Sequence, residues 1–132
     1  MAQLLAVVAN GGKKVTPRIV KEIQNQQGQT VEVIEPAEPV EAIQPETATL
    51  LREYLTGVIE SGTGWRAAST IVSTAGKTGT SQYQGVWFAG MAPADEPQWV
   101  ISIYLPKRDA GGKEGAEIFK TIVDKVAILS GM

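Results

Sequence analysis

IVSTAGKTGTSQ, the sequence of Ile71–Gln82, is the stretch on which the interpretation of the whole chain depends. If this stretch is a strand, its side chains alternate between two faces. Lys77 and Gly79 then share one face, and Thr78 and Thr80 share the other. A lysine between glycines, followed by two alternate threonines, makes this the place to look for chemistry.

One interpretation is that Gly76-Lys77-Thr78 ends a phosphate-binding P-loop. That motif requires another glycine five positions before Gly76, where this chain has Ile71. It also requires a helix to begin after the threonine, where this chain has Gly79. Both requirements fail, and the sequence argues against a nucleotide-binding loop.

Three further interpretations concern the lysine itself. Lys77 as the base for Ser73 or Ser81 is disfavoured, because four residues of a strand span about 13 Å, which exceeds hydrogen-bond reach. An anion site at a sheet edge would use the ammonium and the threonine hydroxyls to hold a carboxylate, while the glycines allow a backbone N–H to approach a reacting carbonyl. A surface strand with a solvated lysine is the simplest alternative, and the residues alone leave these last two open.

Composition narrows the function classes. At 132 residues, with 43% hydrophobic and 20% charged residues, the chain has the size and composition of one globular domain. A net charge of −2 gives no electrostatic reason to expect a nucleic-acid partner. The chain has no cysteine and no histidine, which removes thiol nucleophiles, an imidazole base and zinc sites built from those ligands, so we expect no metal and no cofactor. The apolar run Leu4–Ala9 is far shorter than the ~20 residues of a spanning helix.

Periodicity and turn residues predict an α+β chain: an antiparallel sheet of about three core strands flanked by helices, with an extra N-terminal β-hairpin. Short connections at 82–85 and 93–97 favour an antiparallel meander, and Lys107–Lys113 should be a loop. In the N-terminal part, a helix end and hairpin are expected over 1–34, with a helix at 2–9 and strands at 15–23 and 30–34. A connector over 35–45 and a helix over 46–61 should follow. The three-stranded meander is expected over 70–105, with strands at 70–81, 85–92 and 98–105, before a C-terminal helix over 114–130.

Two helical stripes are expected to be buried. The first consists of Leu51, Tyr54, Leu55 and Val58, in a helix that ends where Gly62 supplies a positive φ. The second, in the last helix, should pack on the sheet; it consists of Ala116, Phe119, Ile122, Val123 and Val126. Trp87 and Phe88 are expected to serve the core or strand packing, as aromatic residues on strands commonly do.

The central stretch resembles the Lys-Thr-Gly strand of penicillin-binding proteins, the serine acyltransferases that carry the motifs S-x-x-K, S-x-N and K-T-G. The similarity covers nearly the whole chain. Segments in the order of the high-molecular-mass transpeptidases are Ala2–Lys13, Val15–Ile23, Gly62–Gly64, Gly76–Thr80 and Trp87–Asp95.

By this resemblance, Lys77 and the hydroxyls of Thr78 and Thr80 would bind the carboxylate of a peptidoglycan stem peptide or of a β-lactam. The backbone N–H of Thr80 would be one of two oxyanion-hole donors, and Gly79 would keep the strand open to the acyl group. The resemblance also implies a position at the outer face of the bacterial cytoplasmic membrane, with an anchor that this chain does not contain.

The serine motifs of the family are absent from the chain. None of its six serines has a lysine three residues later, and none has an asparagine two residues later. We therefore expect the C-terminal part of a serine-type D,D-transpeptidase domain, without the nucleophile and not catalytic alone. Its partner would be the upstream half of the domain, or a second copy in a dimer or domain swap.

Two rivals from other classes remain. A non-catalytic binding or assembly module would self-associate through an exposed sheet edge, because exposed edges pair with other chains. Self-association would distinguish it from a fragment that needs the upstream half. A stand-alone enzyme using carboxylates is the weaker rival, since Glu and Asp lie mainly in connectors and on helix surfaces, where solvation explains them.

Overall fold

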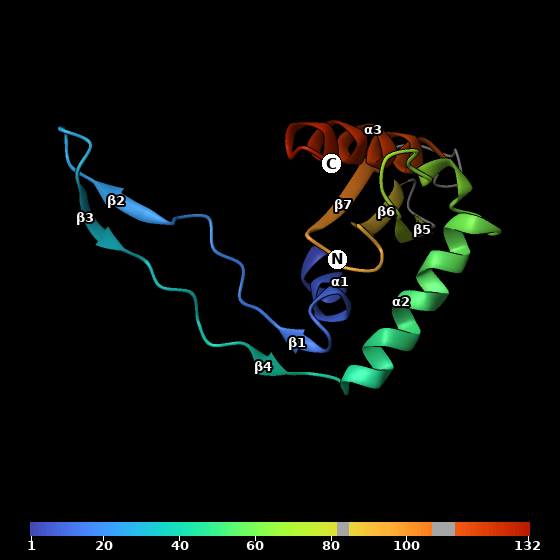
Figure 1. The fold of residues 1–132 in the computed structure, drawn as a ribbon, viewed down its shortest axis with the longest axis horizontal. Coiled ribbons are helices and arrows are strands. Elements are labelled where there is room, and N and C mark those ends of the chain that lie inside the picture. Colours follow the sequence, from blue (N-terminus) through green and yellow to red (C-terminus); the bar gives the residue numbers. More distant parts are fainter. Residues whose placement is uncertain (82–84, 107–112) are drawn as a thin grey trace.

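A three-stranded antiparallel sheet forms the centre of the computed structural model, which describes residues 1–81, 85–106 and 113–132 (Figure 1). Its strands are β5 (Ala75–Ser81), β6 (Gly85–Ala92) and β7 (Trp99–Pro106), in the order β5-β6-β7. The α+β class and the meander expected from the short connections are confirmed. The turn expected at 82–85 and the loop expected at 107–113 lie outside the described residues, apart from the last residue of each.

Two buried clusters cover the two faces of this sheet. Phe88 and Ala89 are neighbours on β6 and point to opposite faces, so they belong to different clusters. Helix α3 (Lys113–Leu129) and the short helix η1 (Trp65–Ala67) cover the face of Phe88, and helix α1 (Ala2–Ala9) covers the other. The first cluster is Ile59, Ala67, Phe88, Ala92, Ala116, Phe119 and Val123, and the second is Leu5, Val8, Ala75, Ala89, Met91 and Ala94.

Helix α3 packs by a slightly different stripe from the predicted one. Ala116, Phe119 and Val123 are fully buried, as expected, and the rings of Phe88 and Phe119 lie with centroids 4.9 Å apart. Ile122 is exposed, whereas Ala127 is fully buried. At 3.6 residues per turn, Ala127 follows Val123 on the same side of the helix, and Ile122 lies off it.

Helix α2 (Pro45–Glu60) contacts β5 and α1, and its first residue is a proline, which suits a helix start (Figure 1). The predicted buried stripe on this helix is wrong for Leu51 and Tyr54, whereas Leu55 packs as predicted and Val58 is half-buried. Leu51 is 38% exposed and Tyr54 is 63% exposed, whereas Ala48 and Ile59 are buried and Leu55 packs against the α1-side cluster. These three residues are seven and four positions apart, which places them along one narrow side of the helix.

The N-terminal hairpin projects away from the sheet (Figure 1). Its strands β2 (Glu22–Gln24) and β3 (Thr30–Val33) are shorter than expected, and the predicted strand over 15–23 is wrong for its first seven residues. Pro17 lacks an N–H for a strand ladder, which disfavours a strand through that position. The expected connector also contains a strand, because β4 (Val40–Glu41) pairs with β1 (Lys13–Lys14).

The strand expected to begin at residue 70 begins at Ala75 instead. Side-chain hydrogen bonds hold the preceding backbone in bends: the N–H groups of Ile71 and Val72 donate to Ser69 Oγ, and Ser73 Oγ donates to Asp95. Such local bonds compete with a strand ladder. They fix the point at which β5 enters the sheet, two residues before Lys77.

Candidate functional site

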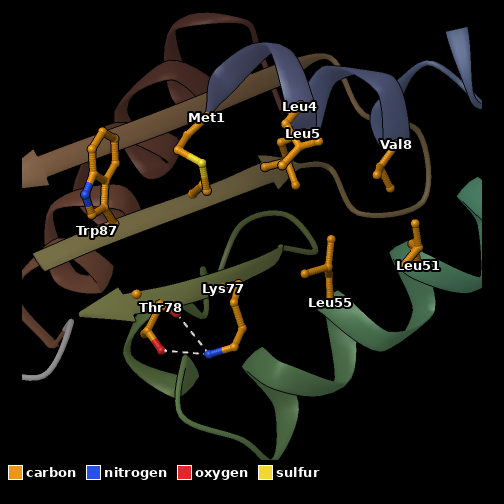
Figure 2. A pocket seen from close by; sticks show the side chains of 11 residues that line it. Met1, Leu4, Leu5, Val8, Leu51, Leu55, Lys77, Thr78 and Trp87 are labelled. Carbon is orange, nitrogen blue, oxygen red and sulfur yellow. Dashed lines mark hydrogen bonds between the residues drawn. The ribbon is translucent and has the colours of Figure 1, made fainter. Parts of the chain in front are cut away.

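Lys77 and Thr78 lie at a sheet edge, because β5 is an outer strand that pairs with β6 alone in the described part of the chain. Lys77 is opposite Ala89 and Thr78 is opposite Phe88, so their side chains leave the strand on opposite faces. The lysine side chain then turns towards the edge. Its Nζ donates to the carbonyl oxygen of Thr78 at 2.9 Å and to Thr78 Oγ1 at 3.2 Å (Figure 2). An ammonium and a hydroxyl therefore converge at one point of the edge.

The geometry of β5 follows the alternation expected from the sequence. Its pairing with β6 runs without a register shift from Ala75, opposite Met91, to Ser81, opposite Gly85. Gly79 lies opposite Trp87 and Thr80 opposite Val86. The four residues predicted to bind substrate therefore lie on one regular strand.

An apolar pocket lies beside this edge (Figure 2). It has a volume of about 350 Å³, and Lys77 and Gly79 line it together with side chains from α1 and α2. Leu4, at 67% exposure, is the most open of the leucines that line it. The complete lining is Met1, Leu4, Leu5, Val8, Leu51, Leu55, Lys77, Thr78, Gly79, Trp87 and Ala89.

A second hollow continues along the same strand. It is lined by Met1, Gly79, Thr80 and Trp87, so Gly79 and Trp87 border both hollows. Phe88 is fully buried, as predicted. Trp87 packs against Tyr104 with ring centroids 4.6 Å apart, and it also borders the pocket, which the prediction of a packing role did not include.

Thr63 joins this group from a distant part of the sequence. Its Oγ1 lies 3.1 Å from Thr78 Oγ1, within hydrogen-bond distance. The predicted positive φ at Gly62 is wrong, because the glycines with positive φ in the described residues are Gly11, Gly12, Gly28 and Gly131. Gly62 serves close approach instead: a Cβ there would lie 2.8 Å from the carbonyl oxygen of Val58. The flanking glycines were the only sequence signal for Thr63.

Charge at the edge is positive. Among the described residues, no carboxylate forms an ion pair with Lys77. The carboxylates with shifted pKa values lie elsewhere. A hydrogen bond from Ser73 lowers the pKa of Asp95, and burial raises the pKa of Asp124, but hydrogen bonds from Lys120 and Ser69 outweigh it and lower that pKa overall. Lys77 is therefore available to an incoming anion.

Metal ligands do not gather near this edge or elsewhere in the described ranges: no group of three or more carboxylates, histidines or cysteines is placed to hold an ion. Nor does any helix in those ranges combine the length and apolar character needed to cross a membrane. The chemistry of the edge is thus that of an ammonium, hydroxyls and a glycine-containing backbone.

The fold and the edge together define an α+β domain whose outer strand presents Lys-Thr-Gly-Thr beside an apolar pocket. The chain belongs to the family of penicillin-binding protein transpeptidase domains, because the model "Penicillin binding protein transpeptidase domain" matches residues 1–124. The family resemblance drawn from the motifs is confirmed.

Curated relatives agree with this assignment. Penicillin-binding protein PbpB of Mycolicibacterium smegmatis is 39% identical over 88% of this chain and 21% of its own length. Peptidoglycan D,D-transpeptidase MrdA of Acinetobacter baumannii is 27% identical over 94% of this chain and 21% of its own length. The chain thus spans about a fifth of these relatives.

Solved structures show the same fold. Penicillin-binding protein 3 of Mycobacterium tuberculosis in its apo form is 28% identical, with a TM-score of 0.86 over 99% of this chain and 34% of that chain. The same protein complexed with aztreonam gives a TM-score of 0.87 at 28% identity and the same coverage. The described elements therefore correspond to about one third of a solved transpeptidase chain.

Proposed function

We propose that this chain is the C-terminal portion of a peptidoglycan D,D-transpeptidase domain, and that it binds the acyl donor without supplying the nucleophile. The observation that carries this proposal is the convergence of Lys77 Nζ and Thr78 Oγ1, 3.2 Å apart, at the outer edge of β5. Charge-assisted hydrogen bonds from an ammonium to a carboxylate are among the stronger ones in proteins. The ligand would be the carboxylate of a stem peptide or of a β-lactam.

Two neighbouring residues also belong to the proposed site. The backbone N–H of Thr80 supplies one oxyanion donor, which would stabilise the charge that develops on the carbonyl oxygen during acylation. Gly79 leaves room above the strand, where it borders both hollows beside Trp87. The aztreonam complex of the M. tuberculosis relative supports a β-lactam as one ligand of this class.

The apolar pocket is assigned to the rest of the domain. The chain covers about one third of the solved transpeptidase chains, so in a complete domain of this kind the remaining two thirds would pack against this chain. Leu4 and Leu51 present exposed apolar surface on that side, and burial of such surface contributes about 25 cal/mol per Å². A segment seated there would lie next to Lys77, where the nucleophile is needed. From the family resemblance, we propose that the complete protein acts at the outer face of the cytoplasmic membrane.

The proposal is tested by weighing intact protein after incubation with a labelled penicillin. The isolated chain should gain no covalent adduct, because no S-x-x-K is present in its 132 residues. The complete transpeptidase that contains this chain should gain one adduct per active site. A stoichiometric adduct on the isolated chain would contradict the proposed division of roles.

An assembly module is the second candidate, and the outer edge of β7 favours it. Within the described ranges β7 pairs only with β6, and Tyr104 on β7 is 48% exposed. Edges of this kind pair with other strands. Sedimentation of the isolated chain discriminates: a tight dimer would support pairing or a domain swap, whereas a monomer that binds the remaining part of the domain would support the transpeptidase.

A further inference from the structure

The Thr63 hydroxyl lies within hydrogen-bond distance of the hydroxyl that we assign to the carboxylate site. We propose that Thr63 is a positioning residue for acyl-donor binding: it fixes the Thr78 hydroxyl so that its proton faces the carboxylate of the ligand. This inference rests on the proposed function, and it adds a residue outside the Lys-Thr-Gly strand. Thr63 belongs to the loop Gly62–Gly64, fifteen positions before Thr78.

Counting hydrogen-bond groups supports this role. A threonine hydroxyl has one proton and two acceptor positions. Thr78 Oγ1 accepts from Lys77 Nζ at 3.2 Å, which uses one acceptor position. When Thr63 donates across the 3.1 Å contact, it uses the second, and the Thr78 proton is left for a group outside the pair. A carboxylate only accepts, so it selects this arrangement.

The loop that carries Thr63 is held firmly in place. The N–H of Gly64 donates to the carbonyl oxygen of Val58 at 3.0 Å, at the end of α2. A Cβ on Gly64 would lie 2.9 Å from Ile59 Cδ1, so the loop is pressed against the helix. Thr63 itself is exposed, which leaves its side chain without a packing role. A loop bonded to and packed on the helix, together with an exposed hydroxyl, suits a positioning residue.

The test compares acylation of the complete transpeptidase by a penicillin with a free carboxylate and by its methyl ester. We expect Thr63→Val to lower the ratio of the two second-order acylation constants by about three- to tenfold, the size of one neutral hydrogen bond. Thr63→Ser keeps the hydroxyl and should restore the ratio. Thr121→Val is the matched control, because its hydroxyl donates only to the backbone of its own helix, to Glu117 O at 2.9 Å. The melting temperatures of all variants should agree closely, since substitutions at exposed sites change stability little.

Lys77→Met and Thr78→Val separate the two levels of the argument. If these variants lower the ratio and Thr63→Val does not, the positioning role is wrong and the proposed carboxylate site stands. If neither Lys77→Met nor Thr78→Val changes the ratio, the carboxylate site itself is wrong, and the role of Thr63 falls with it. Equal losses for acid and ester in Thr63→Val, or no rescue by serine, would also overturn the inference.

Discussion

Gly76, the residue before Lys77, offers a quantitative test of how β5 is seated. A Cβ at this position would lie 2.8 Å from the carbonyl oxygen of Ala89, 2.8 Å from Phe88 Cζ and 3.0 Å from the Cα of Gly90. Two of these atoms are backbone and the third belongs to a fully buried ring, so none moves cheaply. Gly76→Ala should therefore destabilise the fold by about 1–3 kcal/mol, the usual cost of overpacking.

Gly57 provides the matched control for this substitution. It lies inside α2, and a Cβ there would meet nothing within 4 Å. Gly57→Ala should stabilise by about 0.5–1 kcal/mol, because alanine loses less backbone entropy in a helix. The same substitution thus has opposite signs at the two positions.

Urea denaturation, followed by the fluorescence of the three tryptophans, measures both effects. With slopes of about 1–3 kcal/mol per molar urea, the midpoint of Gly76→Ala should fall by roughly 1 M, and that of Gly57→Ala should rise slightly. A Gly76→Ala midpoint at or above the wild-type value would refute the packing of β5 against β6 described above.

Two further outcomes follow from the site and from α3. Gly79→Ala places a Cβ 3.3 Å from Trp87 Cβ, and a small shift relieves this contact, so stability should change by less than about 1 kcal/mol. Acylation of the complete transpeptidase should nevertheless become slower. Unchanged acylation would show that the acyl group does not need the space that Gly79 leaves. Asp124 accepts from Lys120 and Ser69, each at 2.5 Å, and its pKa is lowered on folding, so its stabilising effect is present above the usual carboxyl pKa and is lost as pH falls through the lowered value. At pH 7, Asp124→Asn should unfold at a lower urea concentration than wild type, with a free energy of unfolding that is lower by at most about 1 kcal/mol. This difference in free energy should shrink below about pH 4. A difference that persists in acid would exclude the Asp124 carboxylate as its source.

The sheet and its edge strand could be predicted because local signals agree there. Short polar breaks separate three apolar runs, and the confirmed meander follows from that spacing. The start of β5 could not be predicted in the same way. Bonds from Ser69 and Ser73 hold the residues before Ala75 out of the ladder, and only the folded chain brings Ser73 to Asp95.

Helix α2 shows the limit of periodicity. Its apolar spacing indicates an amphipathic helix correctly, but it does not say which apolar residues meet a partner. Tyr54 is exposed and Ala48 is buried because β5 and α1 contact one narrow side of the helix. The carboxylate site has the same limit. The glycines of Gly62–Gly64 draw attention to Thr63 in the sequence, but only the folded chain shows that its hydroxyl lies 3.1 Å from the hydroxyl of Thr78.

Acylation of the complete transpeptidase carrying Lys77→Met tests the carboxylate site most directly. Methionine keeps the apolar stem that borders the pocket and removes the ammonium. For a penicillin with a free carboxylate, the second-order acylation constant should fall by about 10- to 150-fold, which corresponds to about 1.5–3 kcal/mol for one hydrogen bond to a charged group. With the methyl ester, the Lys77→Met enzyme should react at nearly the wild-type rate. Lys125→Met is the matched control: Lys125 is an exposed lysine of α3, and its replacement should leave both acylation constants unchanged. Equal losses for acid and ester, or no loss for either, would contradict the assignment of Lys77 to the substrate carboxylate.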